Sequence, residues 1–382
     1  MKEGNNIETK IVYLQKDDVF FLDLRTKVNE YFKRNRISKQ DDKRMYFKTG
    51  VQILLWTSLY ALMLSNYVYG LALFILQIAF QFSMFLMSVG IAHDGSHSSY
   101  SQNSRINKIM YSVFDLIGIN SDMWEYNHNL SHHYVPNIAF YDSAIDSFGL
   151  FRFHPKAKYY WFHRYQHYYI FIIYAFATLF KLLFLDFFSL NRNQIGIVKI
   201  EKHSIKKIVY LIFTKCFVIF YTLIIPVLVI KESSWHIVYG FIAGHLVSGI
   251  ALGIIFQVTH LSDNTIFVEP DENGIIYNSF SNHILKTTSD FAIKSKTVTW
   301  ISGGLNMHVA HHLFPKISQI HLPVLTRIVK ETAIVYAMPY KEYTSVFAAI
   351  RSHLKLLKKL GSKAVITSNE WPINANSNTS KI

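Results

Sequence analysis

Long apolar segments alternate with polar and basic segments along this chain. No Asp, Glu, Lys or Arg occurs from Thr49 to His93, and this run is about twice as long as the roughly 20 residues that one bilayer crossing needs. Polar and helix-breaking residues interrupt it from Ser65 through Gly70, which predicts a turn there. The pattern therefore predicts two membrane-spanning helices, at about 49–66 and 71–92, joined as a hairpin.

Two more apolar segments predict a second hairpin. They run from Ile208 to Ile230 and from Trp235 to Thr259, and each is long enough for one crossing. Because both hairpins cross and return, the N-terminal segment and the region beyond residue 259 lie on the same side of the membrane. The external tips lie near Asn66 and at residues 231–234.

The apolar, aromatic-rich segment His167–Leu190 is ambiguous. It contains Lys181 and Asp186, and charges near the centre of a bilayer are costly. If it crossed, the basic stretch that follows it would lie opposite the basic N-terminal segment, against the positive-inside rule. That stretch contains Arg192, Lys199, Lys202, Lys206 and Lys207. We therefore expect an interfacial helix at about 167–190 and four crossings in total.

These assignments predict an all-α integral membrane protein whose four transmembrane helices carry a cytoplasmic helical cap. The polar, charged segment 1–48 is expected to be cytoplasmic, without a signal peptide. The membrane domain covers 49–323, and cytoplasmic or interfacial helices follow at 324–360. Within them, the amphipathic pattern of 343–360 predicts an interfacial helix. The polar tail 361–382 is predicted to be disordered.

The charge balance agrees with a cytoplasmic N-terminus and C-terminus. The formal net charge is +14, and basic residues suit a cytoplasmic surface that meets anionic lipid. Basic composition also suits nucleic acid, but the chain contains no nucleic-acid-binding motif, which argues against nucleic acid as a partner. The single cysteine, Cys216, lies in an apolar span, so no disulfide is expected.

Eight histidines form three short clusters near the predicted membrane boundaries. They are His93 and His97; His128, His132 and His133; and His308, His311 and His312. Histidines four apart on a helix share one face, so each cluster offers two or three imidazoles to a common point. With one cysteine in the chain, the ligands are nitrogen rather than thiolate, which favours iron, copper or zinc.

His260 is a ninth candidate ligand, because it follows the last crossing and emerges on the same face as the clusters. Nine imidazoles exceed what one ion uses, since zinc takes about four ligands and non-haem iron about six. Two metal ions are therefore predicted. Flanking polar residues that could orient the imidazoles are Asp94, Asn127, Asn129 and Asn306. The remaining histidines are expected to be structural or surface residues: His154, His163, His167, His203, His236, His245, His283, His321 and His353.

A pair of nitrogen-ligated ions at a membrane surface suits oxidation of an unactivated C–H bond in a lipid chain. Two other classes of protein are weaker alternatives. A membrane haem electron carrier would place single histidines inside apolar spans, where His245 is the one good candidate. A metal transporter would carry ligands at mid-membrane depth, whereas these clusters lie outside the spans. A zinc protease is disfavoured because His-Glu-x-x-His is absent.

The sequence resembles the integral-membrane fatty acid desaturases. The pattern His-x-x-x-His, His-x-x-x-His-His and His-x-x-His-His, interleaved with two pairs of crossings, covers about Thr49 to Pro323. The segment from Gly303 through Pro315 is similar to the third histidine box of front-end acyl-lipid and acyl-CoA desaturases. That branch usually has Gln where this chain has His308.

The resemblance implies a di-iron site, held by the nine histidines, that uses dioxygen to place a cis double bond in an acyl-CoA or acyl-lipid chain. Membrane lipid hydroxylases share this histidine architecture and remain an alternative. Many eukaryotic front-end members also carry a fused cytochrome b5 domain with a His-Pro-Gly-Gly motif, which this sequence lacks. The resemblance therefore implies electrons from a separate ferredoxin or cytochrome b5.

Overall fold

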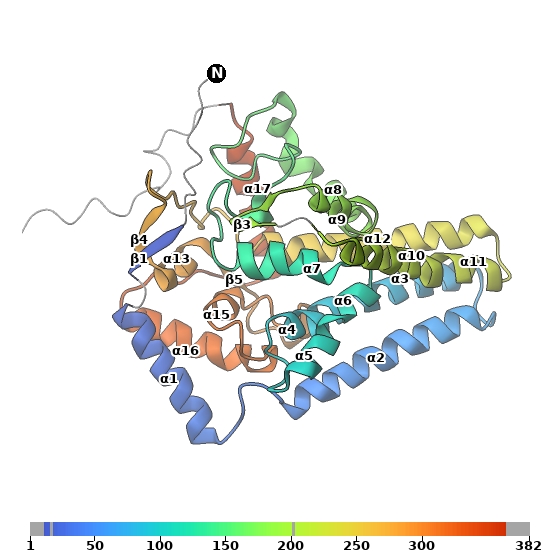
Figure 1. Ribbon diagram of the computed structural model, residues 1–382, viewed down its shortest axis with the longest axis horizontal. Coiled ribbons are helices and arrows are strands. Elements are labelled where there is room, and N and C mark those ends of the chain that lie inside the picture. The colour runs from blue at the N-terminus through green and yellow to red at the C-terminus, as the bar shows by residue number, and fades with distance from the viewer. Residues whose placement is uncertain (1–10, 16–17, 201–202, 364–382) are drawn as a thin grey trace, which may run out of the picture.

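In the computed structural model, which describes residues 11–15, 18–200 and 203–363, a group of long helices projects from a wider cap (Figure 1). The first hairpin consists of α2 (Lys43–Leu64) and α3 (Gly70–Met87). The second consists of α10 (Ile205–Ile219), a π-helical turn at Phe220–Ile224, α11 (Ile225–Val229) and α12 (Ser234–Gln257). Helices thus occupy the four ranges in which the apolar pattern predicts crossings.

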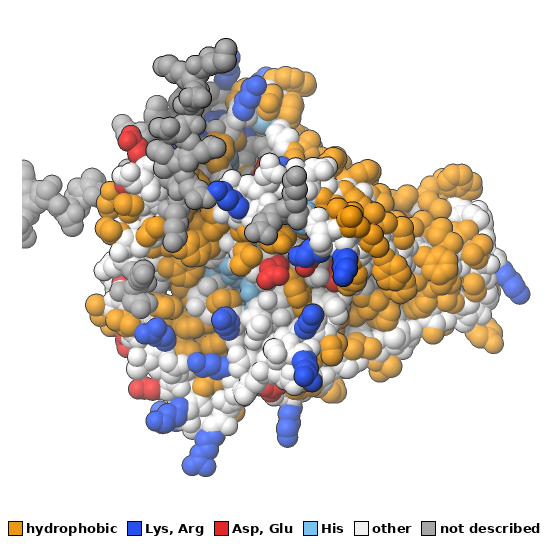
Figure 2. Space-filling model, in the orientation of Figure 1, with side chains coloured by type: hydrophobic (Ala, Val, Ile, Leu, Met, Phe, Trp, Pro, Cys, Tyr) orange, Lys and Arg blue, Asp and Glu red, His pale blue; other side chains and the backbone are white. Residues whose placement is uncertain are grey.

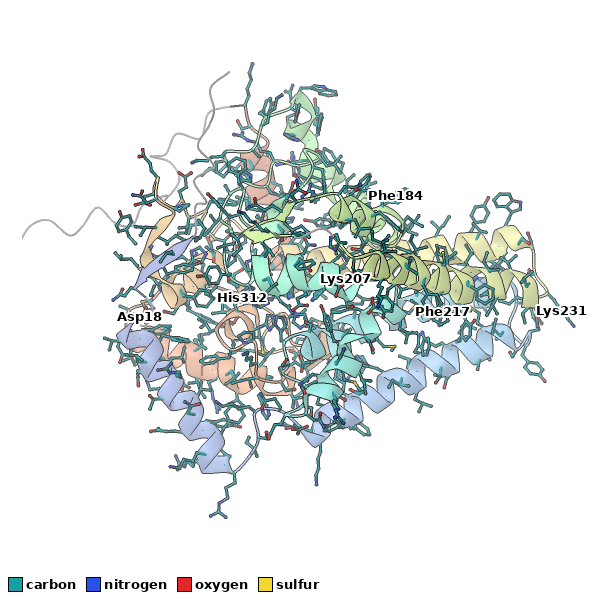
Figure 3. All side chains as sticks on the ribbon, in the orientation of Figure 1. Asp18, Phe184, Lys207, Phe217, Lys231 and His312 are labelled. Atoms are coloured by element: carbon teal, nitrogen blue, oxygen red, sulfur yellow. The ribbon has the colours of Figure 1, made fainter. Side chains whose placement is uncertain are left out.

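The turns of the two hairpins meet at the end of the bundle far from the cap. The side-chain oxygen of Asn66 accepts a hydrogen bond from Lys231 N at 2.7 Å. In the same place, Gly70 N donates to Glu232 Oε1 at 2.8 Å. Figure 3 shows Lys231 at this tip and His312 well to the other side of the molecule. The predicted turn after residue 64 is confirmed, because α2 ends and α3 begins on either side of it.

The outer surface of the bundle is apolar, as expected for a membrane protein. Figure 2 shows hydrophobic side chains covering the projecting helices, while most Lys and Arg side chains gather over the cap. Within the described residues, five helical segments are long and apolar enough to cross a membrane: Lys43–Leu64, Gly70–Ser96, Trp161–Leu190, Ile205–Val229 and Ser234–Gln257. The third of these contains the segment that the sequence predicts to be interfacial.

The third segment begins and ends beside the cap. It consists of α8 (Gln166–Phe180), a π-helical turn at Lys181–Leu185 and α9 (Asp186–Leu190), and α8 packs along α12. At its start, the Gln166 side chain donates to Leu357 O of the cap at 2.7 Å. Just after its end, Arg192 pairs with Asp146 of the cap at 2.9 Å.

The charges that made this segment ambiguous neutralise one another. Asp186 is fully buried and pairs with Lys181 at 2.8 Å and with Lys215 of α10 at 2.5 Å. Its carboxylate also accepts a hydrogen bond from Asn120 N at 3.0 Å. Buried ions persist in proteins when they are paired and hydrogen-bonded in this way. Because Asn120 caps the helix that leads to the second histidine cluster, the network joins α9 and α10 to the cap.

Helices α8 and α12 approach closely at Gly249. A Cβ atom there would overlap the backbone carbonyl groups of Tyr174 and Ala175. We expect Gly249→Leu to destabilise the protein by about 1–3 kcal/mol, the usual cost of overpacking a close-packed interior, and to lower its melting temperature in detergent. Gly50→Leu is the matched control, because Gly50 has open space around it. Equal melting temperatures for the two variants would contradict this helix contact.

The cap consists mainly of short helices with three small two-stranded sheets, so the described residues are predominantly helical, as the all-α prediction expects. Strand β1 (Val12–Gln15) pairs in parallel with β4 (Ile275–Ser279), β2 (Gln194–Ile195) pairs antiparallel with β3 (Val198–Lys199), and β5 (Asp290–Phe291) pairs in parallel with β6 (Glu342–Tyr343). Two of these pairs join distant parts of the chain, so local sequence patterns do not reveal them. The cap helices not yet named are α1 (Val19–Asn35), α4 (His93–Ser96), α5 (Ser104–Tyr111), α6 (Val113–Leu116), α7 (Ser121–Trp124), α13 (Phe280–Thr287), α14 (Lys296–Ile301), α15 (His308–Leu313), α16 (Leu322–Val335) and α17 (Val346–Leu360).

The last helix, α17, lies within the segment predicted to be an interfacial helix, and part of its apolar face is buried by the protein. Its apolar residues Leu356, Leu357 and Leu360 are at most 1% exposed, and they pack with Ile170 and Tyr174 of α8. Contact with α8 thus accounts for part of the amphipathic pattern, while Phe347 is 83% exposed, and the interfacial position of α17 stays a prediction. The tail predicted to be disordered lies outside the described residues from residue 364 onward.

Candidate metal centre

The first histidine cluster continues directly from α3. After Met87 the helix widens into a π-helical turn, Ser88–Ala92, and ends as α4, which begins at His93. His97 follows as the C-cap residue of α4. Both imidazoles are buried, so the cap end of the first hairpin holds two histidines away from solvent.

The second cluster lies on a π-helix, Glu125–His132, rather than on the α-helix that its spacing suggested. In a π-helix the hydrogen bonds join residues five apart, and His133 N donates to His128 O at 3.0 Å. This turn brings the side chains of residues five apart together. His128 therefore shares a face with His133, and His132 points elsewhere.

The third cluster is held against the first by two glycines. Gly303 and Gly304 have φ values of +62° and +79°, a left-handed conformation that glycine adopts without strain. A Cβ atom on Gly303 would collide with Val89 O, in the turn that precedes the first cluster. The six-residue helix α15 then begins at His308, and the Asp290 carboxylate accepts a hydrogen bond from Val309 N at 2.8 Å.

All nine predicted histidines come together in the structure, in two groups. The ligand atoms of His93, His97, His128, His133 and His311 lie within 4.8 Å of one another, as do those of His132, His260, His308 and His312. The expectation that each cluster serves one point holds for His93 and His97 and is wrong for the second and third clusters. The adjacent residues His132 and His133 of the second cluster lie in different groups. The adjacent residues His311 and His312 of the third cluster do so as well. Neighbouring side chains on a helix point in different directions, so each pair links two sites.

The spacing of the imidazole nitrogens fits metal ligation. The Nε2–Nε2 distances are 3.0 Å for His93–His128, 3.1 Å for His128–His133, 3.1 Å for His133–His311, 3.1 Å for His132–His260 and 3.1 Å for His260–His312. Two nitrogens that each lie about 2.1 Å from one ion, at right angles, are about 3 Å apart. The Nε2 atoms of His97 and His308 are buried without a hydrogen-bond partner, as expected for atoms that face an ion.

The imidazoles are held in the neutral form that binds metals. Burial lowers the pKa of His97 and of His308 to about 3. Burial likewise lowers the pKa of His128, and the neighbouring His133 adds to this effect. Each of these rings therefore keeps a nitrogen lone pair free at neutral pH.

Three acceptors that the sequence did not indicate orient imidazoles in the four-histidine group. The Nδ1 atom of His132 lies 3.0 Å from Asp142 Oδ1, that of His260 lies 3.2 Å from Thr287 O, and that of His308 lies 3.0 Å from Leu305 O. Such contacts fix the tautomer and direct Nε2 toward a metal. Two of the acceptors are backbone carbonyls, for which the sequence carries no signal. Asp142 was missed because it follows His132 by ten residues.

The four polar residues predicted to orient imidazoles have other partners, which corrects that prediction. Asp94 accepts hydrogen bonds from Ser318 Oγ and Gln319 N, each at 3.1 Å. Asn127 donates to Met123 O, Asn129 to Ser96 O, and Asn306 to Phe291 O. They fasten the backbone segments that carry the histidines instead. Asp94, Asn127 and Asn129 each lie beside a histidine in sequence, so they point away from that histidine's own face, and Asn306 lies two residues before His308.

Two aromatic rings contact the centre where it meets the helical bundle. The centroid of the Phe256 ring lies 5.9 Å from the ring centroid of His128 and 6.5 Å from the ring centroid of His308. Phe256 therefore contacts both histidine groups. The Trp124 ring lies 6.1 Å from that of Phe256 and 4.6 Å from that of His128. The centre therefore has an apolar wall at this position.

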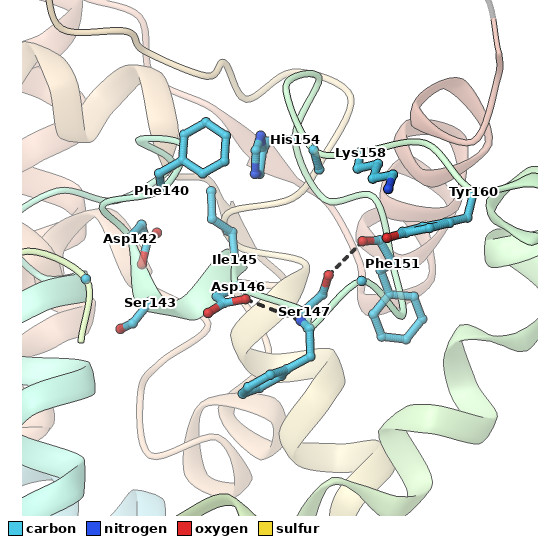
Figure 4. A pocket seen from close by; sticks show the side chains of 14 residues that line it. Phe140, Asp142, Ser143, Ile145, Asp146, Ser147, Phe151, His154, Lys158 and Tyr160 are labelled. Carbon is cyan, nitrogen blue, oxygen red and sulfur yellow. Dashed lines mark hydrogen bonds between the residues drawn. The ribbon is translucent and has the colours of Figure 1, made fainter. Parts of the chain in front are cut away.

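A pocket of about 420 Å³ lies on the cap beside the centre (Figure 4). Asp142 lines it, together with Phe140, His154, Lys158 and Tyr160. The same carboxylate contacts His132, so a single side chain separates this pocket from the four-histidine group. The nine histidines predicted to be structural or surface residues do not belong to either group.

Comparison with known proteins agrees with this arrangement. A family model described as fatty acid desaturase matches residues 65–344. The chain belongs to the fatty acid desaturase family. It is accordingly a membrane oxidoreductase that desaturates fatty acids, and its histidine groups are suited to hold metal.

Similar desaturases are found in several different organisms. The sn-1 linoleoyl-lipid 6-desaturase of Synechocystis sp. is 30% identical over 88% of this chain and 94% of its own length. The acyl-lipid (8-3)-desaturase of Physcomitrium patens is 30% identical over 90% of this chain and 72% of its own. The probable Delta(5) fatty acid desaturase C of Dictyostelium discoideum is 31% identical over 92% of this chain and 77% of its own length. The similarity thus spans the cap and the bundle of this desaturase.

Proposed function

We propose that this desaturase holds two iron ions, one in each histidine group, and introduces a cis double bond into the acyl chain of a membrane lipid. The division of nine buried imidazoles into groups of five and four carries the proposal. One ion cannot use nine ligands, and nitrogen ligands suit iron. The group of four leaves more room for a non-protein ligand than the group of five.

The chain's own residues hold, orient and shield this centre. Two bound iron ions would supply the redox chemistry of the reaction. In that reaction two hydrogens leave adjacent acyl carbons, and together with two electrons and two protons they reduce dioxygen to two water molecules. Asp142 holds the His132 ring in place. Trp124 and Phe256 present an apolar wall, which would exclude water and contact the acyl chain. Position matters because neighbouring methylene groups hardly differ in reactivity.

The names of the relatives support an acyl-lipid substrate and a double bond near the carboxyl end. They include a linoleoyl-lipid 6-desaturase and a Delta(5) desaturase. We propose the same substrate class for this chain. A separate ferredoxin or cytochrome b5 would supply the electrons, and the basic character of the chain suits an acidic donor.

Product analysis tests this function. A bacterium expressing the chain with a ferredoxin system is expected to accumulate a new unsaturated fatty acid, identified by gas chromatography with mass spectrometry. The His132→Ala/His311→Ala variant, which removes one imidazole from each group, should lack it. A hydroxylated product would instead assign the chain to the lipid hydroxylases, and the absence of bound iron would overturn the di-iron site.

We further propose four crossings, with the N-terminus, the C-terminus and the metal centre in the cytoplasm. The contacts of Gln166 and Arg192 with the cap support this topology, because a crossing helix would separate its two ends. In a Cys216→Ser background, Lys231→Cys is expected to react with a membrane-impermeant maleimide on intact cells. Arg192→Cys should react only after permeabilisation. Labelling of Arg192→Cys on intact cells would mean that the segment 161–190 crosses.

A further inference from the structure

A second pocket, of about 360 Å³, lies where α2 meets the loops around the third histidine cluster. Its lining combines apolar and basic side chains: Lys48, Ile293, Lys294, Lys296, Trp300 and Met307 contribute to it. Met307 directly precedes His308, so the segment that carries the third histidine cluster also lines part of this pocket. We call it the lysine pocket.

The buried lysine of this pocket lacks a carboxylate in direct contact. The Lys48 side chain is 6% exposed, its Nζ atom donates to the neutral amide oxygen Oε1 of Gln319 at 2.6 Å, and it lies 5.6 Å from the Trp300 ring centroid. Asp94 is near enough to attract it, but that carboxylate is hydrogen-bonded to Ser318 and Gln319. Burying an ammonium group without a paired charge is costly, so the pocket favours an anion.

Two further lysines extend the positive charge to the rim. Lys294 and Lys296 line the pocket and are exposed. Among the residues that the structure describes, neither these two nor Lys48 forms an ion pair with Asp or Glu. Three positive side chains therefore surround a space in which the lining contains no acidic residue.

The lysine pocket lies at the start of the apolar part of α2. Lys48 is in the second turn of α2, and the uncharged apolar run begins at the next residue. On the same helix Phe47, Leu54 and Leu62 are exposed, by 75%, 66% and 44%, as expected for side chains in contact with lipid. An anionic group that also carries acyl chains would therefore find its charge partner in the pocket and its apolar partner beside it.

Gln319 connects this pocket to the first histidine cluster as well as the third. Its side-chain amide donates to Gly90 O at 2.9 Å, in the π-helical turn that precedes His93. An anion bound by Lys48 would thus lie close to two segments of the chain. Gln319 links it to the segment that carries His93, and Met307 belongs to the segment that carries His308. Such a short path suits a substrate that is oxidised near its headgroup.

We propose that the lysine pocket binds the phosphate of a glycerophospholipid whose acyl chain is the substrate. The role of the acyl chain as the substrate rests on the proposed function, whereas the binding of the phosphate does not. Lys48 neutralises the phosphate from within, Lys294 and Lys296 do so from the rim, and Trp300 packs against the glycerol backbone. Anchoring the headgroup here fixes the distance from the carboxyl end to the metal centre.

Calorimetric titration of the full-length, iron-loaded protein in a neutral detergent tests the pocket. The probes are dioctanoyl phosphatidylglycerol, uncharged dioctanoylglycerol, coenzyme A and inorganic phosphate. Phosphatidylglycerol is expected to bind most tightly. The exposed double variant Lys294→Gln/Lys296→Gln should weaken its binding about tenfold or more, since each lysine near a charged lipid contributes severalfold in affinity. Lys48→Met should weaken it further, and Lys48→Arg should restore part of the loss.

The control is Lys43→Gln/Lys316→Gln, which removes two exposed lysines that do not line the pocket. It should bind phosphatidylglycerol like the wild type. Equal affinity of Lys294→Gln/Lys296→Gln and of this control for phosphatidylglycerol would overturn the proposal. Tighter binding of coenzyme A, inorganic phosphate or dioctanoylglycerol than of phosphatidylglycerol would overturn it as well. The proposed function is tested separately by product analysis. Lysine-dependent lipid binding without a new double bond would refute the function and leave the pocket assignment standing.

Discussion

Replacing His312 with Ala is expected to lower bound iron from two ions per chain to about one and to reduce desaturation to below about a hundredth of the wild-type level. His312 belongs to the group of four, and its Nε2 atom lies 3.1 Å from that of His260. Removing a direct ligand should cost more than the 10- to 100-fold loss that follows removal of a group that only supports a ligand. Iron is counted by mass spectrometry of the purified protein, and desaturation by product analysis.

The control for this variant is His236→Ala. His236 lies near the tip of the second hairpin and belongs to neither histidine group, so the variant should retain two irons and full activity. A His312→Ala protein that still bound two irons and desaturated normally would refute the division into two sites. Loss of both irons with a normal melting temperature would show that the two groups fill together.

Asp142→Asn is expected to weaken iron binding in the four-histidine group about 10- to 100-fold, with activity partly recovered at high iron concentration. The Asp142 carboxylate accepts from His132 Nδ1 at 3.0 Å and from the backbone N–H groups of Ala144 and Asn137, at 2.8 and 2.9 Å. An amide keeps the shape of the side chain but loses the charge that supports a metal-bound imidazole. Iron affinity is measured by competition with a chelator.

Asp146→Asn provides the matched control for this experiment. Asp146 lies in the same loop and lines the same pocket, but its carboxylate pairs with Arg192 rather than with a histidine. This variant should bind iron like the wild type. If both variants lost iron equally, the effect would come from the loop as a whole, and a specific role for Asp142 would be excluded.

Much of the site follows from residue type and local spacing. All nine histidines predicted as ligands lie in two groups that could each hold a metal ion. Residue type singled out these positions because few structural roles require adjacent histidines in a chain that has one cysteine. Their role as iron ligands stays a proposal until iron is measured. The interrupted apolar run also located the turn after Leu64, because a bilayer-length helix has a fixed number of residues.

The predictions that failed depend on backbone geometry and on contacts that the spacing of residues does not reveal. An α-helical reading paired His128 with His132, whereas the π-helix pairs His128 with His133. The residues expected to orient the imidazoles were chosen for their nearness in sequence. Asp142, Thr287 and Leu305 hold that position instead, because a side chain beside a ligand in the chain points away from it in space.

A helical membrane protein with nine clustered histidines follows from the amino-acid sequence, since hydrophobic length and residue chemistry are local properties. The folded arrangement was needed to show which imidazoles lie together, which acceptors orient them, and that the segment containing Lys181 and Asp186 begins and ends beside the cap. These outcomes depend on packing. Gly303 lets the third cluster approach Val89, and Lys215 neutralises Asp186 from another helix, and neither contact can be read from the spacing of residues along the chain.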